Sequence, residues 1–194
     1  MQRLIEIRWH GRGGQGAVTA SKLLAEAALS EGFYIQAFPE YGAERMGAPV
    51  RSFNRISSEV IDLHCQISNP DIVMVLDQTL LETIDVIAGI KNGGSIIINT
   101  PKSPGEILSM LQKKDDKNIS FYTVDASRIS LDTIGKVIPN TPMVGALIKV
   151  MGLLKLKTLD TIIKKTLSKK ISAPIVEANM IAAKKAYEEV RQNA

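Results

Sequence analysis

Cysteine is nearly absent from this 194-residue chain, in which Cys65 stands alone. A single thiol forms no internal disulfide and provides neither an iron–sulfur ligand set nor a zinc ligand set. We therefore expect no cluster or metal site on this chain. The lack of disulfides is typical of a reducing cytoplasm, and we expect Cys65 to be a small buried hydrophobic side chain.

Long hydrophobic runs are also missing. The longest, residues 143–154, is interrupted by Lys149, whereas a membrane span needs about 20 apolar residues. The N-terminal sequence MQRLIEIRWHGRGGQG lacks the continuous apolar segment of a signal peptide. These absences predict a soluble, cytoplasmic protein that is not inserted in a membrane.

Aromatic residues and excess charge are both scarce. Aromatic residues make up 5% of the chain, and the formal net charge is only +4, with a pI of about 9.1. We find no clustered basic face and no aromatic stacking motif, so nucleic acid is not an expected partner. The mild positive charge is compatible with an acidic ligand or a negatively charged protein surface.

The chain does contain a regular alternation of strand and helix patterns. We predict strands at residues 4–9, 33–38, 50–57, 59–64, 71–76, 95–99 and 120–124. Runs that are apolar on both faces belong to buried, mostly parallel strands. The alternation predicts an α/β protein, a three-layer α/β/α sandwich with a mostly parallel, Rossmann-like sheet. Strands 50–57 and 59–64 are expected to add an antiparallel hairpin, and residues 1–194 to form one domain.

Helix start signals follow several of these strands. Thr79 with Glu82, and Ser103 with Glu106, have the spacing of a capping box, and Pro104 stands at a first helical position. Apolar residues at helical spacing predict further helices at residues 20–28, 143–154, 159–167 and 176–190.

The glycine-rich segment after the first strand is the main candidate for ligand binding. Gly11, Gly13 and Gly16 match the pattern G-x-G-x-x-G between a strand and a helix. Such a loop brings backbone N–H groups at a helix start close to an anion, and Arg12 adds a planar donor. We predict a loop that contacts phosphate or pantetheine, made of Gly11, Arg12, Gly13, Gly14, Gln15 and Gly16.

Two features argue against the hypothesis that the chain is an independent nucleotide-binding enzyme. A dinucleotide site requires an acidic residue at the end of the second strand, but the nearest, Glu40, lies beyond Pro39. The loop also lacks the lysine of a phosphate-binding P-loop. A free-standing Rossmann-type protein therefore stays an alternative, and so does a tight turn that binds nothing.

Three segments together resemble the gamma subunit of 2-oxoacid:ferredoxin oxidoreductases. The first signature is residues 10–16, HGRGGQG; the second is residues 40–50, EYGAERMGAPV; the third is residues 140–146, NTPMVGA. They follow the family's order and spacing across nearly the whole chain. Where many members have Tyr-Gly-x-Glu-x-Arg-Gly-Gly, this chain has Glu44-Arg45-Met46-Gly47-Ala48-Pro49, a variant that looks like the pyruvate branch.

The resemblance implies a subunit of an enzyme complex. The complete enzyme would convert pyruvate, coenzyme A and oxidised ferredoxin into acetyl-CoA, CO2 and reduced ferredoxin. Thiamine diphosphate, Mg and 4Fe-4S clusters would lie in partner subunits only, among the alpha, beta and delta chains. The gamma subunit would assist coenzyme A binding beside the active site, with no catalytic residue of its own. The alternatives within the family are 2-oxoisovalerate, 2-oxoglutarate and indolepyruvate as substrates.

The resemblance also marks further site residues. We expect a substrate channel or subunit interface at Tyr41, Gly42, Glu44, Arg45, Gly47, Asn140 and Thr141. His10 is interpreted as a residue that orients the turn rather than as a catalyst, and His64 as a strand-end residue without a chemical role.

Overall fold

The structure is a computed structural model that describes residues 4–40, 47–111 and 118–192. Its strands are β1 (Leu4–Arg12), β2 (Tyr34–Glu40), β3 (Pro49–Ser57), β4 (Ile72–Val75), β5 (Ser95–Asn99), β6 (Ser120–Val124) and β7 (Arg191–Gln192). Its helices are α1 (Ala17–Ser30), α2 (Leu80–Thr83), α3 (Pro104–Leu111), α4 (Ala126–Ile134), α5 (Asn140–Met151), α6 (Leu156–Leu167) and α7 (Ala173–Glu189).

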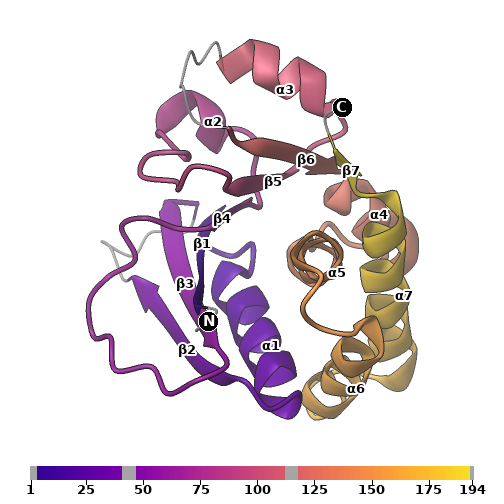
Figure 1. Cartoon of the computed structure of the whole chain (residues 1–194). Helices are drawn as coiled ribbons and strands as arrows, with labels where there is room; N and C mark the ends of the chain where they lie inside the picture. The colour runs from indigo at the N-terminus through magenta and orange to yellow at the C-terminus, as the bar shows by residue number, and fades with distance from the viewer. Residues whose placement is uncertain (1–3, 41–46, 112–117, 193–194) are drawn as a thin grey trace.

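One sheet with the strand order β2-β3-β1-β4-β5-β6-β7 organises the chain (Figure 1). Strands β1, β4, β5 and β6 pair in parallel, whereas β3 is antiparallel to both of its neighbours and β7 is antiparallel to β6. Five of the seven strands, including β2, therefore point in the same direction. The predicted mostly parallel α/β sheet with an antiparallel addition is confirmed.

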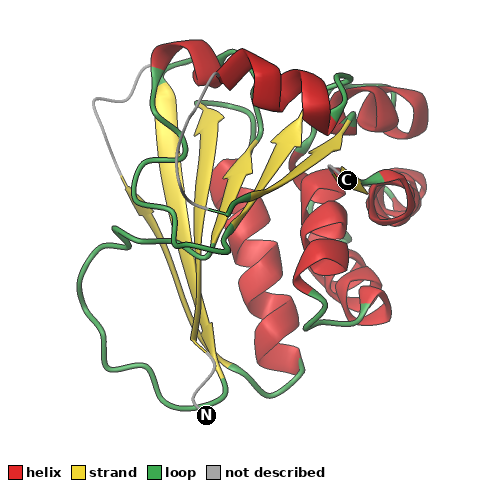
Figure 2. Cartoon of the chain, turned by 45° about the horizontal axis from the view of Figure 1, so that its top comes forward, coloured by secondary structure: helices red, strands yellow, loops and turns green. Residues whose placement is uncertain are grey.

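The antiparallel pair differs from the one that we predicted. Strand β3 pairs with β2, with Ile35 opposite Ile56 and Phe38 opposite Phe53. The predicted strand at residues 59–64 is wrong, because that segment belongs to the long loop between β3 and β4 (Figure 2). Ser58 alone is too short to reverse the chain, since the tightest common hairpin loops contain two residues.

Helices cover the two faces of the sheet unequally. Helices α1, α4, α5, α6 and α7 share one hydrophobic core with β1, β4 and β5, while α2 and α3 lie over the other face of β4, β5 and β6. Figure 2 shows the two helical layers on either side of the yellow strands. The predicted three layers are therefore present.

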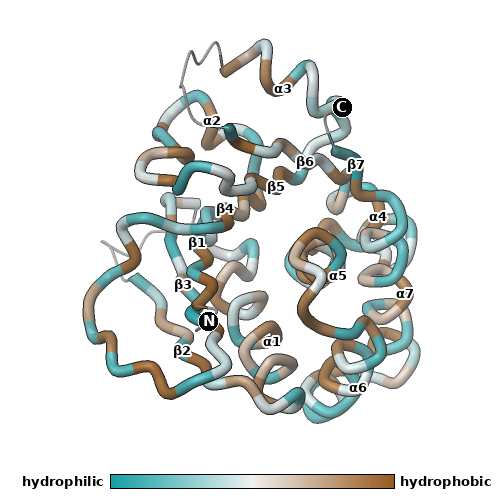
Figure 3. The backbone as a smooth tube through the Cα atoms, viewed as in Figure 1, coloured by the Kyte–Doolittle hydropathy of each residue, from teal (hydrophilic) through white to brown (hydrophobic). Residues whose placement is uncertain are grey.

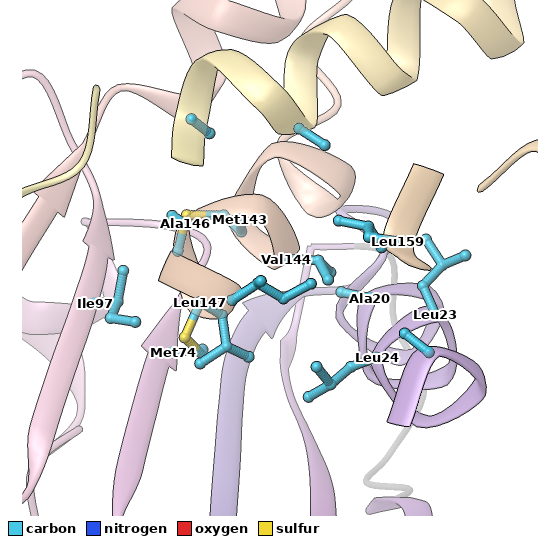
Figure 4. Close-up of a cluster of buried hydrophobic side chains, with 14 of the residues drawn as sticks. Ala20, Leu23, Leu24, Met74, Ile97, Met143, Val144, Ala146, Leu147 and Leu159 are labelled. Carbon is cyan, nitrogen blue, oxygen red and sulfur yellow. The ribbon is translucent and has the colours of Figure 1, made fainter. Parts of the chain in front are cut away.

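Helix α5 forms the centre of the larger core. Ten of its twelve residues are buried, which is typical of a helix that is apolar on all sides. Figure 3 shows its mainly hydrophobic turns between α1 and α7. In Figure 4, Val144 and Leu147 of α5 meet Leu24 of α1 and Met74 of β4.

Local helix signals were partly correct. In the Ser103–Glu106 box, the Ser103 N–H donates to Glu106 Oε2 (2.7 Å) and the Glu106 N–H donates to Ser103 Oγ (3.3 Å). The box predicted at Thr79 is wrong, because its hydroxyl instead donates to Asp77 Oδ1 (2.7 Å). Helix α4 was missed, although Asp125 caps its start and Gly135 its end.

The sheet divides into two halves of different character. In the apolar half (β4, β5 and β6), both faces are apolar; Val73, Val75, Ile96 and Ile98 face one core, and Met74 and Ile97 face the other. In the charged half (β1, β3 and β2), one face packs beneath α1. On the opposite face, charged residues of neighbouring strands lie directly opposite one another. Within the described ranges, no helix is long and apolar enough to cross a membrane.

Candidate ligand-binding edge

The carboxyl ends of β1, β4, β5 and β6 meet at one margin of the sheet, which we call the carboxyl edge. Ligands of open α/β sheets bind at this margin. Here it contains a pocket of about 280 Å³. The pocket is lined by Gln15, Leu76, Asp77, Gln78, Thr79, Asn99, Thr100, Pro101, Asp125, Ser127, Val137 and Pro139.

The glycine-rich first signature lies beside this pocket. Gln15 holds the loop to the edge, because its Oε1 accepts from the Arg12 N–H (2.8 Å) and its Nε2 donates to Asp77 Oδ2 (2.7 Å). Gly14, which is exposed, has a φ of 96° and Gly16 has a φ of 83°, which is the left-handed region that favours glycine. Helix α1 begins at Ala17 with no acidic residue in its first turn, so its N–H groups remain attractive to an anion.

Arg12 connects the first signature to the end of β4. Its Nη2 and Nε both donate to Thr79 Oγ1 (2.8 and 3.3 Å), and its Nε lies 3.2 Å from Asp77 Oδ2. Its Nη1 donates to the Gly47 carbonyl (3.2 Å). Hydrogen bonds among the described residues use three of the five guanidinium donors, which leaves two that could bind an anionic ligand.

Asp77 remains ionised at this edge. Partial burial alone would raise its pKa, but hydrogen bonds from Thr79 and Gln15 and the nearby Arg12 guanidinium together lower the pKa below its ordinary value. The carboxylate thus fixes both Gln15 and Arg12. It also offsets part of the positive charge that a phosphate would otherwise meet.

All three signatures converge at the carboxyl edge. The Gly47 N–H of the second signature donates to the Gly13 carbonyl (3.3 Å), and the Gly13 N–H donates to the Ala48 carbonyl (2.9 Å). Asn140 of the third signature packs so closely on Gly16 that a Cβ at Gly16 would lie 3.1 Å from the Asn140 Cβ. Segments more than 100 residues apart in sequence therefore form one constellation.

The remaining predicted site residues have different outcomes. Thr141 is buried at the start of α5, where its N–H donates to the Asn140 Oδ1 (2.7 Å). Tyr41, Gly42, Glu44 and Arg45 lie outside the described residues, so their predicted role stays a prediction. Cys65 is exposed rather than buried, and His64 lies in the β3–β4 loop rather than at a strand end.

Sequence reasoning missed several polar residues that build the pocket. Asn99 ends β5, and its Nδ2 donates to the Leu76 carbonyl (2.9 Å) and to Ser127 Oγ (2.8 Å). Thr100 donates to Gln78 Oε1 (2.5 Å). The available signal was their position, because each lies at or just after the carboxyl end of a predicted buried strand.

The absent dinucleotide-binding acid has a topological explanation. In a dinucleotide-binding fold the second strand lies next to the first, so its terminal acid reaches the ribose. Here the antiparallel strand β3 separates β2 from β1. Glu40 at the end of β2 instead pairs with Arg51 (2.6 Å). The weakness noted in the sequence thus corresponds to a different strand order.

Comparisons with known proteins identify relatives of this chain. A family described as pyruvate ferredoxin/flavodoxin oxidoreductase matches residues 6–189. The common gamma subunit of the pyruvate and ketoisovalerate oxidoreductases of Pyrococcus abyssi is 50% identical over 188 residues, which cover 97% of this chain and 98% of that subunit.

Solved structures give the same relationship. The pyruvate oxidoreductase subunit PORC of Thermotoga maritima superimposes with a TM-score of 0.84 and 43% identity, covering 99% of both chains. A 2-oxoglutarate:ferredoxin oxidoreductase from Magnetococcus marinus, solved with 2-oxoglutarate, coenzyme A and succinyl-CoA bound, shares the fold at 20% identity. Its TM-score is 0.72, over 96% of this chain and 31% of that longer chain.

Proposed function

The chain belongs to the pyruvate ferredoxin/flavodoxin oxidoreductase family as a gamma-type subunit of a multi-subunit enzyme, and we propose that it contacts coenzyme A through the first signature. In this proposal, alpha, beta and delta subunits supply thiamine diphosphate, Mg and 4Fe-4S clusters. The complete enzyme oxidises pyruvate with coenzyme A to acetyl-CoA and CO2 and reduces ferredoxin.

The observation that carries this proposal is the meeting of the three signatures at the carboxyl edge. The edge combines the start of α1, an arginine with donors to spare and a pocket whose lining residues are mostly of polar types. Coenzyme A is anionic at its nucleotide end, and helix N-termini with an adjacent arginine bind phosphate groups.

Pyruvate is the proposed substrate of the complex, and 2-oxoisovalerate is the second candidate. The candidate 2-oxoisovalerate is favoured by the relative from Pyrococcus abyssi. The name of that relative assigns one gamma subunit to both pyruvate and ketoisovalerate oxidoreductases. A shared gamma subunit implies that other subunits select the 2-oxoacid. We therefore expect this chain to serve whichever alpha and beta subunits it assembles with.

Assembly can be tested by purifying the tagged chain from its native cells. The proposal predicts co-purification of a thiamine-dependent pair and an iron–sulfur subunit. The purified material should reduce ferredoxin when both pyruvate and coenzyme A are present. Activity with 2-oxoisovalerate instead of pyruvate would select the second candidate, and a chain that purifies alone without activity would refute both.

Contact with coenzyme A can be tested with a matched pair of variants in the purified complex. Arg12→Gln and Asp77→Asn both break the Arg12–Asp77 ion pair, but only Arg12→Gln removes the donor group. We expect Arg12→Gln to raise the KM for coenzyme A about tenfold, since a charge-assisted hydrogen bond contributes roughly 1.5 kcal/mol. Asp77→Asn should leave that KM within about twofold. An equal effect of both variants would indicate a purely structural role.

A further inference from the structure

Helix α1 begins at the carboxyl edge with little apolar support under its first turns. The residues that it buries before Leu23 are Ala17, Ala20 and Ser21. Alanine side chains contribute little buried area, and the hydrophobic effect has no directional component. Apolar packing alone would therefore allow the start of α1 to slide or rotate over the sheet.

A buried chain of hydrogen bonds connects this part of α1 to β1 and β3. The indole N–H of Trp9, on β1, donates to Asn54 Oδ1 on β3 (2.8 Å). Asn54 Nδ2 in turn donates to the Ser21 carbonyl of α1 (2.9 Å). Trp9 and Asn54 are both fully buried, so solvent does not compete for these hydrogen bonds.

Two serine hydroxyls make a second connection at the same place. Ser21 Oγ is hydrogen-bonded to Ser52 Oγ of β3 (2.7 Å), and it donates to the Val18 carbonyl within α1 (3.0 Å). Both serines are buried, like the neighbouring Asn54. The two connections from β3, one through Asn54 and one through Ser52, therefore reach the helix at a single residue, Ser21.

These hydrogen bonds supply the directionality that the alanine contacts lack. Hydrogen bonds weaken steeply when their angle or length changes, and a satisfied buried polar network favours one arrangement of a core. Ser21 lies about one helical turn after Ala17, the first residue of α1. Fixing the position of Ser21 therefore fixes the N–H groups at the start of the helix.

Contacts at the helix start show how closely α1 approaches the carboxyl edge. A Cβ at Gly11 would lie 3.3 Å from the Ala17 Cβ, and a Cβ at Gly16 would lie 3.1 Å from the Asn140 Cβ. A displacement of α1 would therefore move the first signature relative to its neighbours on β1 and α5.

We propose that Asn54 and Ser52 are positioning residues, which set the affinity of the complex for coenzyme A by fixing the start of α1 at the carboxyl edge. This inference rests on the proposed contact between the first signature and coenzyme A. Both residues have an exposed fraction of 0%, so neither side chain touches the ligand. They act through Ser21 on the N–H groups of the helix start, which bind phosphate only at hydrogen-bonding distance.

Two variants and a matched control test the inference in the purified complex. Ser52→Ala removes the hydroxyl that contacts Ser21, and Asn54→Leu removes the donor to the Ser21 carbonyl. Ser57→Ala is the control, because Ser57 is also fully buried on β3. Its hydroxyl accepts from the Glu59 N–H in the β3–β4 loop and not from α1.

The variants should change the KM for coenzyme A without changing the other kinetic constants. We expect Asn54→Leu to raise this KM about fivefold and Ser52→Ala about twofold, since misplaced N–H groups lose part of a charge-assisted hydrogen bond. The kcat and the KM for pyruvate should be unchanged, and Ser57→Ala should alter none of the three constants. Ser52→Ala removes only a hydroxyl, so it provides the test even where Asn54→Leu fails to fold.

Arg12→Gln separates a failure of this inference from a failure of the coenzyme A proposal. If Arg12→Gln raises the KM for coenzyme A but Ser52→Ala and Asn54→Leu do not, the contact stands and the positioning role is wrong. If none of the variants changes this KM, both are wrong. An effect of Asn54→Leu without one of Arg12→Gln would support positioning and assign the phosphate to the helix N–H groups. A parallel loss of kcat or of pyruvate affinity, or an equal effect of Ser57→Ala, would show a general structural role and overturn the inference.

Discussion

The apolar and charged halves of the sheet meet at β1 and β4 but are stabilised in different ways. In the apolar half, every residue of β4 is buried, and helices cover both faces. In the charged half, the face opposite α1 contains Arg55, with an exposed fraction of 1%, whose Nε donates to Glu6 Oε1 (3.0 Å). Lys91 extends this pair to Asp71 (2.9 Å).

The difference shows where this chain places its polar chemistry. Strand β4 is apolar along its whole length and contributes packing, and β5 adds one pocket-lining polar side chain, Asn99, only at its carboxyl end. The charged half instead buries Arg8 and His10 with hydrogen-bonded partners, which is the condition for keeping such groups inside a protein. The three signatures lie at the end of β1, where the two halves join.

The largest effect is expected from over-packing the helices above the apolar half. A Cβ at Gly145 of α5 would lie 2.9 Å from the Ala183 Cα of α7, so neither backbone can yield easily. Gly145→Val should lower the free energy of unfolding by about 3 kcal/mol or more. Gly105→Ala, at an open position of α3, is the control and should be neutral or slightly stabilising. Urea unfolding measures both.

The next effect comes from leaving a buried charge without its partner in the charged half. Glu6→Gln preserves shape but removes the charge that compensates Arg55, so we expect a loss of about 2 kcal/mol. Asp132→Asn breaks the exposed pair with Arg128 and should cost less than about 0.5 kcal/mol. Equal losses in urea unfolding would mean that burial does not distinguish the two pairs.

A pH dependence should follow from His10. Its folded pKa is about 3, below the ordinary 6.5, so the unfolded chain takes up a proton more readily. This contribution to stability is complete above pH 6.5 and is lost as the pH falls toward 3. Between pH 6 and 5, stability should fall by about 1 kcal/mol per pH unit. His10→Gln should flatten this slope and His64→Gln should not; an unchanged slope in His10→Gln would refute the assignment.

The smallest effect concerns α3, one of the helices that cover the apolar half. Ser103→Ala removes the side-chain cap of α3 and should cost about 0.5 kcal/mol. Ser109→Ala in the same helix alters an exposed hydroxyl and should have almost no effect. If Ser103→Ala lowered the free energy of unfolding more than Glu6→Gln in the same assay, the proposed order of these two effects would be wrong.

Much of the fold could be predicted because the apolar half has strong local signals. The runs at residues 71–76 and 95–99 are apolar on both faces, which predicts buried parallel strands wherever they lie in the sheet. The charged half depends on long-range pairing. Residues 59–64 have strand composition, but the carbonyls of Ile61 and Leu63 accept hydrogen bonds from the Gln36 side chain, while β2 occupies the edge beside β3.

The candidate site was predictable to the extent that it lies in continuous motifs. The first signature is recognisable from glycine spacing, and Gly47 and Asn140 from the resemblance. That all three meet follows only from the folded chain, through contacts such as the one between Gly16 and Asn140. A second pocket, on the face of the sheet opposite α1, is lined by His10, Arg51 and Glu40 among others and had no local signal, because the register of β2 on β3 brings Glu40 beside Arg51.

The most direct test of the central claim places a carboxylate at the start of α1. Thr19 is exposed in the first turn of this helix, where a negative charge stabilises the helix but repels an anionic ligand. In the purified complex, the KM for coenzyme A should be several-fold higher in Thr19→Glu than in Thr19→Gln. The KM for pyruvate should be the same in the two variants, and the thermal stability of Thr19→Glu should not be lower. Equal KM values for coenzyme A in the two variants would contradict the claim that the carboxyl edge contacts this cosubstrate.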